Sequence, residues 1–281
     1  MAGFDLHAHS TVSDGTLPPA EVVARAAEAG LEGMALTDHD HVGGVAEAQA
    51  TGRRLGIEVI AGVELSAEDA QAGELHLLGY FVDPNDAALL ARLAELRDMR
   101  ARRGAAMVER LRAAGVPITL AEVEREVAPG AALGRPHVAR VLVAKGHATS
   151  IQDVFDRWLA EGRPGYVPKE RLSPQDAIAL VHAAGGVAVL AHAVTVDEPE
   201  REGLVRRLAA MGLDGLEVAH SKHGEQERAT LAAWAQAWGL VATGGSDFHG
   251  ANKPGVALGS VRVGREVVDA LRTRARRHGR S

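Results

Sequence analysis

The first fourteen residues concentrate side chains that bind metal ions. The stretch DLHAHSTVSD contains Asp5, His7, His9 and Asp14. If its first part forms a β-strand, alternate side chains share one face, so His7 and His9 point the same way. Two imidazoles placed like this can chelate one ion, with Asp14 reaching it from the loop beyond. The alternative is a chance group of polar residues near a terminus, which the rest of the chain must exclude.

The same residue types recur where later apolar segments end. His39 directly follows the apolar segment MALTD, and Asp247 and His249 are again two residues apart in GGSDFH. Barrel enzymes carry their chemistry at the carboxyl ends of their strands, where residues distant in sequence converge. Any one histidine alone is as readily a hydrogen-bonded structural residue as a ligand, but the whole set favours a shared metal site. The candidate ligands are His7, His9, Asp14, His39, Glu64, His76, His192, Asp247 and His249.

Six imidazoles and three carboxylates exceed what a single ion needs. They suit two or three divalent ions, with a carboxylate such as Glu64 bridging them. Nitrogen and oxygen ligands favour Mn, Fe or Zn over softer metals, and the sequence does not choose among these. We take Mn as the first expectation, with Fe or Zn as alternatives. Thiolate sites, disulfides and a cysteine nucleophile are excluded because the chain has no cysteine.

Short apolar runs alternate with helical patterns along most of the chain. Residues 18–30 begin with prolines and end at a glycine, as helices often do, and residues 43–56 are also helical in pattern. Strands alternating with helices of about a dozen residues indicate βα units and a parallel sheet. Six or seven such strands favour a closed α/β barrel over an open sheet. The expected strands lie within residues 31–40, 57–66, 74–82, 185–192, 213–220 and 239–249.

Residues 86–162 interrupt this alternation. They carry helical periodicity in several segments with no strand pattern between them. We therefore expect a discontinuous barrel domain, formed by residues 1–85 and 163–281. The segment 86–162 would then be an α-helical insertion covering the active site.

Composition and charge narrow the classes of partner. Of the 281 residues, 46% are hydrophobic, which suffices for a packed core, whereas only 3% are aromatic, so alanine, valine and leucine must fill that core. A net charge of −6 argues against a duplex-DNA binder, which needs a broad basic surface. No apolar run reaches the length of a membrane span, and no secretory signal pattern is present. We expect a cytoplasmic protein, monomeric or a small homo-oligomer, without a membrane partner.

Taken together, the motifs resemble a known family. The segments DLHAHSTVSDG, TDHD, GVELS, HLLGY and GSDFHG, in this order, are similar to those of the PHP (polymerase and histidinol phosphatase) family. The resemblance implies a distorted (β/α)7 PHP barrel and a three-metal centre whose ligands are the nine candidates given above. It is strongest to the branch of 3′,5′-nucleoside bisphosphate phosphatases and 5′→3′ exoribonucleases. One departure is that His192 precedes Ala-Val-Thr, where the family usually has Pro-Gly.

A metal-dependent phosphoesterase mechanism follows from this centre. A metal-bound hydroxide would attack phosphorus in line with the leaving alkoxide, supported by His249, Asp247 and His192. No nucleophilic side chain is needed, and the chain has neither a G-x-S-x-G elbow nor a phosphate-binding loop.

Further phosphate contacts would come from basic residues outside the metal ligands. Arg135 and His137 in GRPHVAR occupy the insertion, and the resembled branch carries a similar Arg-x-His. Lys169 and His223 are further candidates for substrate binding. The alternative for Arg135 and His137 is helix capping or solvation, and for Lys169 a solvated surface position.

The leading hypothesis is hydrolysis of small phosphorylated nucleotides, either 3′,5′-nucleoside bisphosphates or short 5′-phosphorylated RNA. The alternatives are a histidinol-phosphate-type phosphomonoesterase and a non-catalytic metal-binding PHP module. Asp5 and Asp38 either orient ligand imidazoles or satisfy loop backbone. No role is expected for the remaining histidines, His41, His147, His182, His220 and His278.

Overall fold

The computed structural model describes residues 2–127, 133–168 and 171–279, which fall into two compact units. The barrel unit comprises Met1–Arg92 and Arg171–Ser281, and the helical unit comprises Leu93–Glu170. Both boundaries lie a little later in the chain than the expected 86 and 162. That the helical unit covers the active site stays a prediction.

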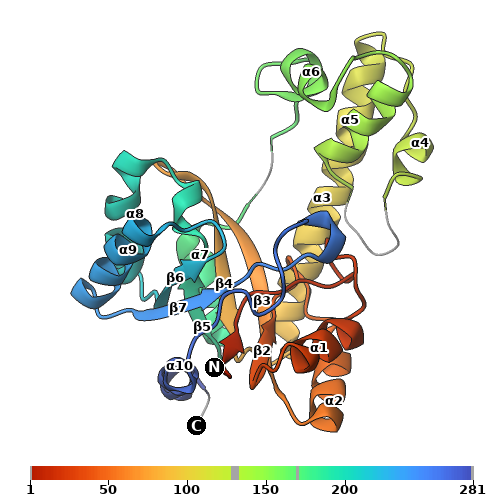
Figure 1. The fold of residues 1–281 in the computed structure, drawn as a ribbon. Coiled ribbons are helices and arrows are strands. Elements are labelled where there is room, and N and C mark those ends of the chain that lie inside the picture. Colours follow the sequence, from red (N-terminus) through yellow and green to blue (C-terminus); the bar gives the residue numbers. More distant parts are fainter. Residues whose placement is uncertain (1, 128–132, 169–170, 280–281) are drawn as a thin grey trace. The chain divides into compact units, whose positions relative to one another are not determined.

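Seven strands form one sheet in which spatial order follows chain order (Figure 1). Next to β1, the backbone N–H of Leu6 donates to the carbonyl of Gly244 over 3.3 Å, and Ala8 forms a parallel bridge with Phe248. These contacts join the first strand to the last, so the predicted seven-stranded α/β barrel is confirmed. The strands are β1 (Phe4–Asp5), β2 (Gly33–Leu36), β3 (Glu58–Asp69), β4 (Gly73–Tyr80), β5 (Val187–Leu190), β6 (Gly215–His220) and β7 (Val241–Gly245).

The expectation of a wholly parallel sheet is wrong for one strand. Strand β4 runs antiparallel to both β3 and β5. The turn between β3 and β4 spans only residues 70–72, which is too short for the crossover that two parallel neighbours require. The remaining pairs, from β1 to β3 and from β5 to β7, are parallel.

The helices of the barrel unit begin and end where the sequence suggests. Helix α1 (Pro19–Glu28) has proline at its first position, and α2 (Val45–Leu55) ends at Gly56, whose φ of 74° is left-handed. Helix α1 buries Val22, Val23 and Ala26 in one apolar cluster with β2. The other helices of this unit are α7 (Pro174–Ala183), α8 (Glu198–Ala210), α9 (Glu225–Ala237) and α10 (Arg265–His278).

The helical unit has its own apolar core. Helix α3 (Ala87–Ala113) begins in the barrel unit and contributes Met107, Val108 and Leu111 to this core. No strand occurs among the described residues 93–127 and 133–168. The other elements are α4 (Leu120–Glu124), α5 (Arg135–Ala144), α6 (Ile151–Val154) and the π-helical turn η1 (Phe155–Leu159). Within the described part of the chain, no helix combines the length and apolarity needed to cross a bilayer.

Candidate metal centre

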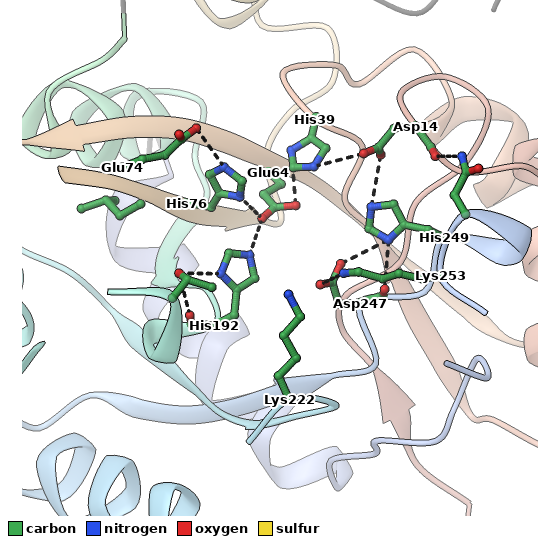
Figure 2. A pocket seen from close by; sticks show the side chains of 13 residues that line it. Asp14, His39, Glu64, Glu74, His76, His192, Lys222, Asp247, His249 and Lys253 are labelled. Atoms are coloured by element: carbon green, nitrogen blue, oxygen red, sulfur yellow. Dashed lines mark hydrogen bonds and ion pairs between the residues drawn. The ribbon is translucent and has the colours of Figure 1, made fainter. Parts of the chain in front are cut away.

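The nine candidate ligands converge at the carboxyl ends of the barrel strands. His7 and His9 follow β1, His39 follows β2 and His192 follows β5. Asp247 and His249 follow β7, while Glu64 and His76 lie within β3 and β4. Part of this set lines a cavity of about 570 Å³ (Figure 2). Residues from position 7 to position 249 therefore meet in one place, as barrel geometry requires.

Glu64 stands at the middle of the imidazoles. Its Oε2 atom lies 3.1 Å from His7 Nε2, 3.0 Å from His9 Nε2 and 3.4 Å from His39 Nδ1. Its Oε1 atom lies 2.8 Å from His76 Nδ1 and 3.0 Å from His192 Nε2. Each carboxylate oxygen thus faces a different set of imidazoles, which is the arrangement a bridging ligand between two cations needs.

Electrostatics make this site attractive to cations. Burial alone would raise the pKa of Glu64, but the imidazoles of His39 and His7 hold it well below its usual range. Burial alone would lower the pKa of His76, but the carboxylates of Glu64 and Glu74 outweigh it and raise that pKa to about 9. These carboxylates therefore favour positive charge at His76, which a metal ion would supply, whereas burial lowers the pKa of His39 to about 3.

A second group of ligands surrounds Asp14. His249 Nε2 lies 3.2 Å from Asp14 Oδ1, and His9 Nδ1 lies 3.6 Å from the same oxygen. His39 Nε2 lies 3.7 Å from Asp14 Oδ2. Ring stacking places His9 and His249 with centroids 4.1 Å apart. Asp14 thus completes a four-residue group with His9, His39 and His249.

Asp247 contacts both of these ligand groups. It also contacts His220, a residue that the sequence interpretation missed. Its Oδ1 atom lies 3.3 Å from His249 Nδ1 and 3.6 Å from Nε2 of His7. Its Oδ2 atom accepts from His220 Nε2 over 3.1 Å and from the ammonium group of Lys253. His220 is fully buried and forms a possible ligand group with His7 and Asp247. The sequence interpretation gave His220 no role; like His192, it lies where a barrel strand ends, and its burial beside His7 and Asp247 makes it a further candidate ligand.

Glu217 is the second residue that the sequence interpretation missed. His7 Nδ1–H donates to Glu217 Oε1 over 3.0 Å, and the backbone N–H of His192 donates to Glu217 Oε2 over 2.7 Å. Glu217 is completely buried in β6. A charged side chain inside the apolar run GLEVA was the sequence signal. One carboxylate therefore orients two candidate ligands.

The sequence left two roles open for Asp5 and Asp38, and in the structure both accept hydrogen bonds from loop residues. Asp5 accepts from the backbone N–H groups of Ser246 and Gly259, at 2.8 and 2.7 Å. Asp38 accepts from the backbone N–H of Ser10 and from the hydroxyl of Ser13. These hydrogen bonds favour the loop-satisfying alternative over orientation of ligand imidazoles.

The backbone at the site approaches closely at one glycine and is left-handed at two candidate ligands. A Cβ atom on Gly245 would lie 2.4 Å from both the Cβ and the backbone nitrogen of His7, so only glycine permits this approach of β7. His192 has a φ of 24° and Asp247 a φ of 60°, a left-handed region that is unfavourable for these residues. Such conformations cluster at functional sites, where the surrounding structure holds them.

The donor set fits divalent metal ions. His9 Nε2 is buried and makes no hydrogen bond, although Glu64 Oε2 lies only 3.0 Å away. A buried ring nitrogen without a hydrogen bond is costly unless another partner satisfies it. Imidazole nitrogens and carboxylate oxygens are the ligands of Mn, Fe and Zn.

The predicted substrate-binding residues lie in different parts of the chain, and those that the structure describes make different contacts. In the helical unit, the guanidinium of Arg135 lies 5.4 Å from the Phe155 ring centre, and His137 Nδ1 accepts from the backbone N–H of Gly134. His223 is 4% exposed, and its Nδ1–H donates to the carbonyl of Val218, so it lies outside the cavity lining. Lys169 lies outside the described residues.

Other polar side chains line the cavity beside the ligands. Lys222, the neighbour of His223, extends into the cavity (Figure 2). Thr195 belongs to the short helical turn Ala193–Thr195, which follows His192 where a Pro-Gly sequence was expected. Its hydroxyl donates to the carbonyl of His192 over 3.1 Å. The departure after His192 thus places a bonded threonine at the cavity edge.

Comparisons with known proteins agree with this geometry. The PHP domain family matches residues 5–117. A 3′,5′-nucleoside bisphosphate phosphatase of Chromobacterium violaceum is 38% identical over 92% of this chain and 91% of its own. The 5′-3′ exoribonuclease Rnm of Escherichia coli is 38% identical over 88% of this chain and 85% of its own. A solved structure of a candidate metal-dependent phosphoesterase from Bifidobacterium adolescentis superposes with a TM-score of 0.80 at 34% identity, covering 97% of this chain and 96% of its own.

Proposed function

Because the chain belongs to the PHP domain family, we propose that it is a metal-dependent phosphoesterase of small phosphorylated nucleotides. Its substrates would be 3′,5′-nucleoside bisphosphates, short 5′-phosphorylated RNA, or both. The observation that carries the proposal is the position of Glu64, which lines the cavity and has five imidazoles around its two carboxylate oxygens.

The nine converging side chains would hold two or three divalent ions, with Mn expected first and Fe or Zn as alternatives. Bound ions of this kind lower the pKa of water and stabilise charge on phosphate oxygens. Glu64 would bridge them, because each of its oxygens faces separate imidazoles. Asp247 and His249, two residues apart on the loop after β7, would complete the centre together with His192.

The protein's own residues prepare the site in two ways. Glu217 accepts the Nδ1 proton of His7, which leaves the Nε2 atom of His7 facing Glu64. It also accepts the backbone N–H of His192, which holds the left-handed turn at that residue. The side chain of His7 and the backbone of His192 are therefore held in position by Glu217 before substrate binds.

Direct attack by water suits the side chains present. Among the described residues that line the cavity, only Thr195 carries a hydroxyl group. This hydroxyl already donates a hydrogen bond to the carbonyl of His192. The lining also holds the ammonium groups of Lys222 and Lys253, of which Lys253 contacts Asp247. Lys222 extends into the cavity, where a phosphate oxygen of the substrate would be attracted to its charge (Figure 2).

A substrate with two phosphates needs a second anchor. We assign this role to Arg135 and His137, the first and third residues of α5. Arginine binds two phosphate oxygens with its fork of N–H donors, and a helix N-terminus favours an anion.

A substrate panel tests this proposal. Purified protein with Mn²⁺ would be assayed on 3′,5′-adenosine bisphosphate, short 5′-phosphorylated RNA and histidinol phosphate, with kcat/KM as the readout and EDTA-treated protein as the control. We expect one or both nucleotide substrates to be hydrolysed far faster than histidinol phosphate, and EDTA to abolish the activity. Preference for histidinol phosphate would replace the proposal with a simple phosphomonoesterase. Inactivity on all three would favour a non-catalytic metal-binding module.

A further inference from the structure

A second cluster of histidine and aspartate side chains lies at the opposite ends of the barrel strands. His182 is in the last turn of α7, which precedes β5, and Asp214 immediately precedes β6. His278 is the final residue of α10. Since the candidate metal centre lies at the carboxyl ends of the strands, this cluster at their amino ends is a separate place in the molecule.

The three side chains converge on one carboxylate. His182 Nε2 lies 2.7 Å from Asp214 Oδ2, and His278 Nε2 lies 3.2 Å from Asp214 Oδ1. The two imidazole rings are stacked, with centroids 3.7 Å apart and planes inclined by 10°. Three elements distant in sequence thus bring two ring nitrogens and a carboxylate within chelating range of one another.

Asp214 is built to stay ionised. It is 6% exposed, and its Oδ2 atom also accepts the backbone N–H of Ala188 over 3.0 Å. Burial would raise its pKa, but the hydrogen bonds from His182 and Ala188 outweigh burial and lower it. The cluster therefore presents a fixed negative charge beside two imidazoles.

Both imidazoles can release their Nε2 atoms to a metal ion. In the present arrangement each Nε2–H donates to Asp214. Neither Nδ1 atom has a hydrogen-bond partner among the described residues, and the side chains are 20% and 25% exposed. The proton can therefore move to Nδ1 and bond to water, which frees the Nε2 lone pair. The two ring planes are nearly parallel, so their lone pairs do not meet at one ion, and one of these partly exposed rings must also turn about its Cβ–Cγ bond.

We propose that His182, Asp214 and His278 bind one divalent transition-metal ion of the zinc, cobalt or nickel class. Two imidazoles and one carboxylate supply three ligands, and water completes the coordination. The ion would tie the end of α10 to the barrel at β6 and α7, so its role is structural. This proposal does not depend on the phosphoesterase activity.

The test compares metal content in matched variants. His182→Gln and His278→Gln each keep a side-chain N–H that can donate to Asp214 but remove the imidazole ligand. His147→Gln in the helical unit is the control, because His147 is not part of the cluster. Each protein would be dialysed against graded Zn²⁺, and bound zinc and thermal unfolding would be measured.

We expect the wild type and His147→Gln to bind one more zinc ion per chain than either cluster variant. The rise in Tm on adding zinc should also be larger for the wild type and His147→Gln than for the two cluster variants. Phosphoester hydrolysis with Mn²⁺ should be the same in all four proteins. Equal zinc content in all four proteins would overturn the proposal and leave the cluster as a hydrogen-bonded contact. If a cluster variant does not fold, zinc-induced shifts of the histidine ring nitrogens in ¹⁵N NMR of the wild type decide the question: without a shift of His182 and His278, the proposal fails.

Discussion

His7 and Glu217 form a buried pair that joins the first strand of the barrel to the sixth. The Nδ1 atom of His7 lies 3.0 Å from Oε1 of Glu217, and neither side chain is exposed to solvent. The carboxylates of Glu217 and Glu64 outweigh the effect of burial and raise the pKa of His7 well above its ordinary value. Glu217 thus fixes which ring nitrogen of His7 is free to face the metal centre.

Glu217→Gln should weaken metal binding without removing a ligand. The amide keeps the size of the side chain but loses the charge that orients His7, and such partners are worth about 10- to 100-fold in metal affinity or activity. Competition with a chelator measures the affinity. Glu225→Gln, an exposed position on α9, is the control. Unchanged affinity in Glu217→Gln would mean that His7 is oriented by other contacts.

His249→Ala should lower turnover by orders of magnitude while the fold stays intact. His249 contacts both Asp14 and Asp247, so its loss opens the group that joins the two carboxylates. Phosphoester hydrolysis with Mn²⁺ gives the turnover, and circular dichroism reports the fold. Near-normal activity would refute the ligand role of His249.

Gly245→Ala should disrupt the centre from the backbone. The added methyl group would meet the backbone of His7 at 2.4 Å, so either β7 or the segment after β1 must move. We expect lower Tm and loss of metal binding. Gly203→Ala in α8 is the matched control, because its Cβ would meet only the flexible end of Arg207, and alanine favours a helix by about 1 kcal/mol. Equal Tm and metal binding in the two variants would contradict the role of close packing at Gly245.

Arg135→Ala should affect substrates unequally. If Arg135 binds a second phosphate, kcat/KM should fall more for 3′,5′-adenosine bisphosphate than for a generic phosphomonoester. Arg140→Ala on the same helix, whose guanidinium pairs with Glu126, is the control. Equal losses on both substrates would remove the proposed specificity role of Arg135.

Metal affinity should rise with pH. The carboxylates around His76 overcome its burial and raise its pKa to about 9, so below this pH the metal-free site carries a proton that a metal ion must displace. Each displaced proton lowers the apparent affinity about tenfold per unit fall in pH. Chelator competition between about pH 6.5 and about pH 8.5 measures this slope. In His76→Gln the slope should be smaller by one proton, and an identical slope would contradict the assignment.

The sequence predicted the nine candidate ligands that the structure brings together, but not the residues that support them, and metal binding by these nine stays a prediction. Most of the nine candidates follow an apolar segment at the end of a strand, whereas Glu64 and His76 lie inside strands between apolar neighbours. Glu217 and His220 lie in the run LEVAH, and nothing in alternation alone shows that their side chains meet His7 and Asp247. In SKHG, likewise, the sequence drew attention to His223, yet Lys222 lines the cavity.

The sequence predicted the barrel and its helices, but it did not predict the direction of strand β4. Hydrophobic periodicity identifies strands and helices but does not state which way a strand runs, so the antiparallel course of β4 was not foreseen. His182 and His278 each lie near the end of a helix, a position usually open to solvent. Only tertiary structure brings them to Asp214, because the three are separated by 32 and 64 positions in sequence.

The adjacency of the first strand to the last has a consequence for biosynthesis. His7 and His9 precede Asp247 and His249 by 240 positions in the chain, and ribosomes add about 5–20 residues per second. Until β7 has been synthesised, the nascent chain therefore contains seven of the nine candidate ligands and lacks Asp247 and His249. A chain that stops before β7 would therefore expose histidines that the closed barrel buries.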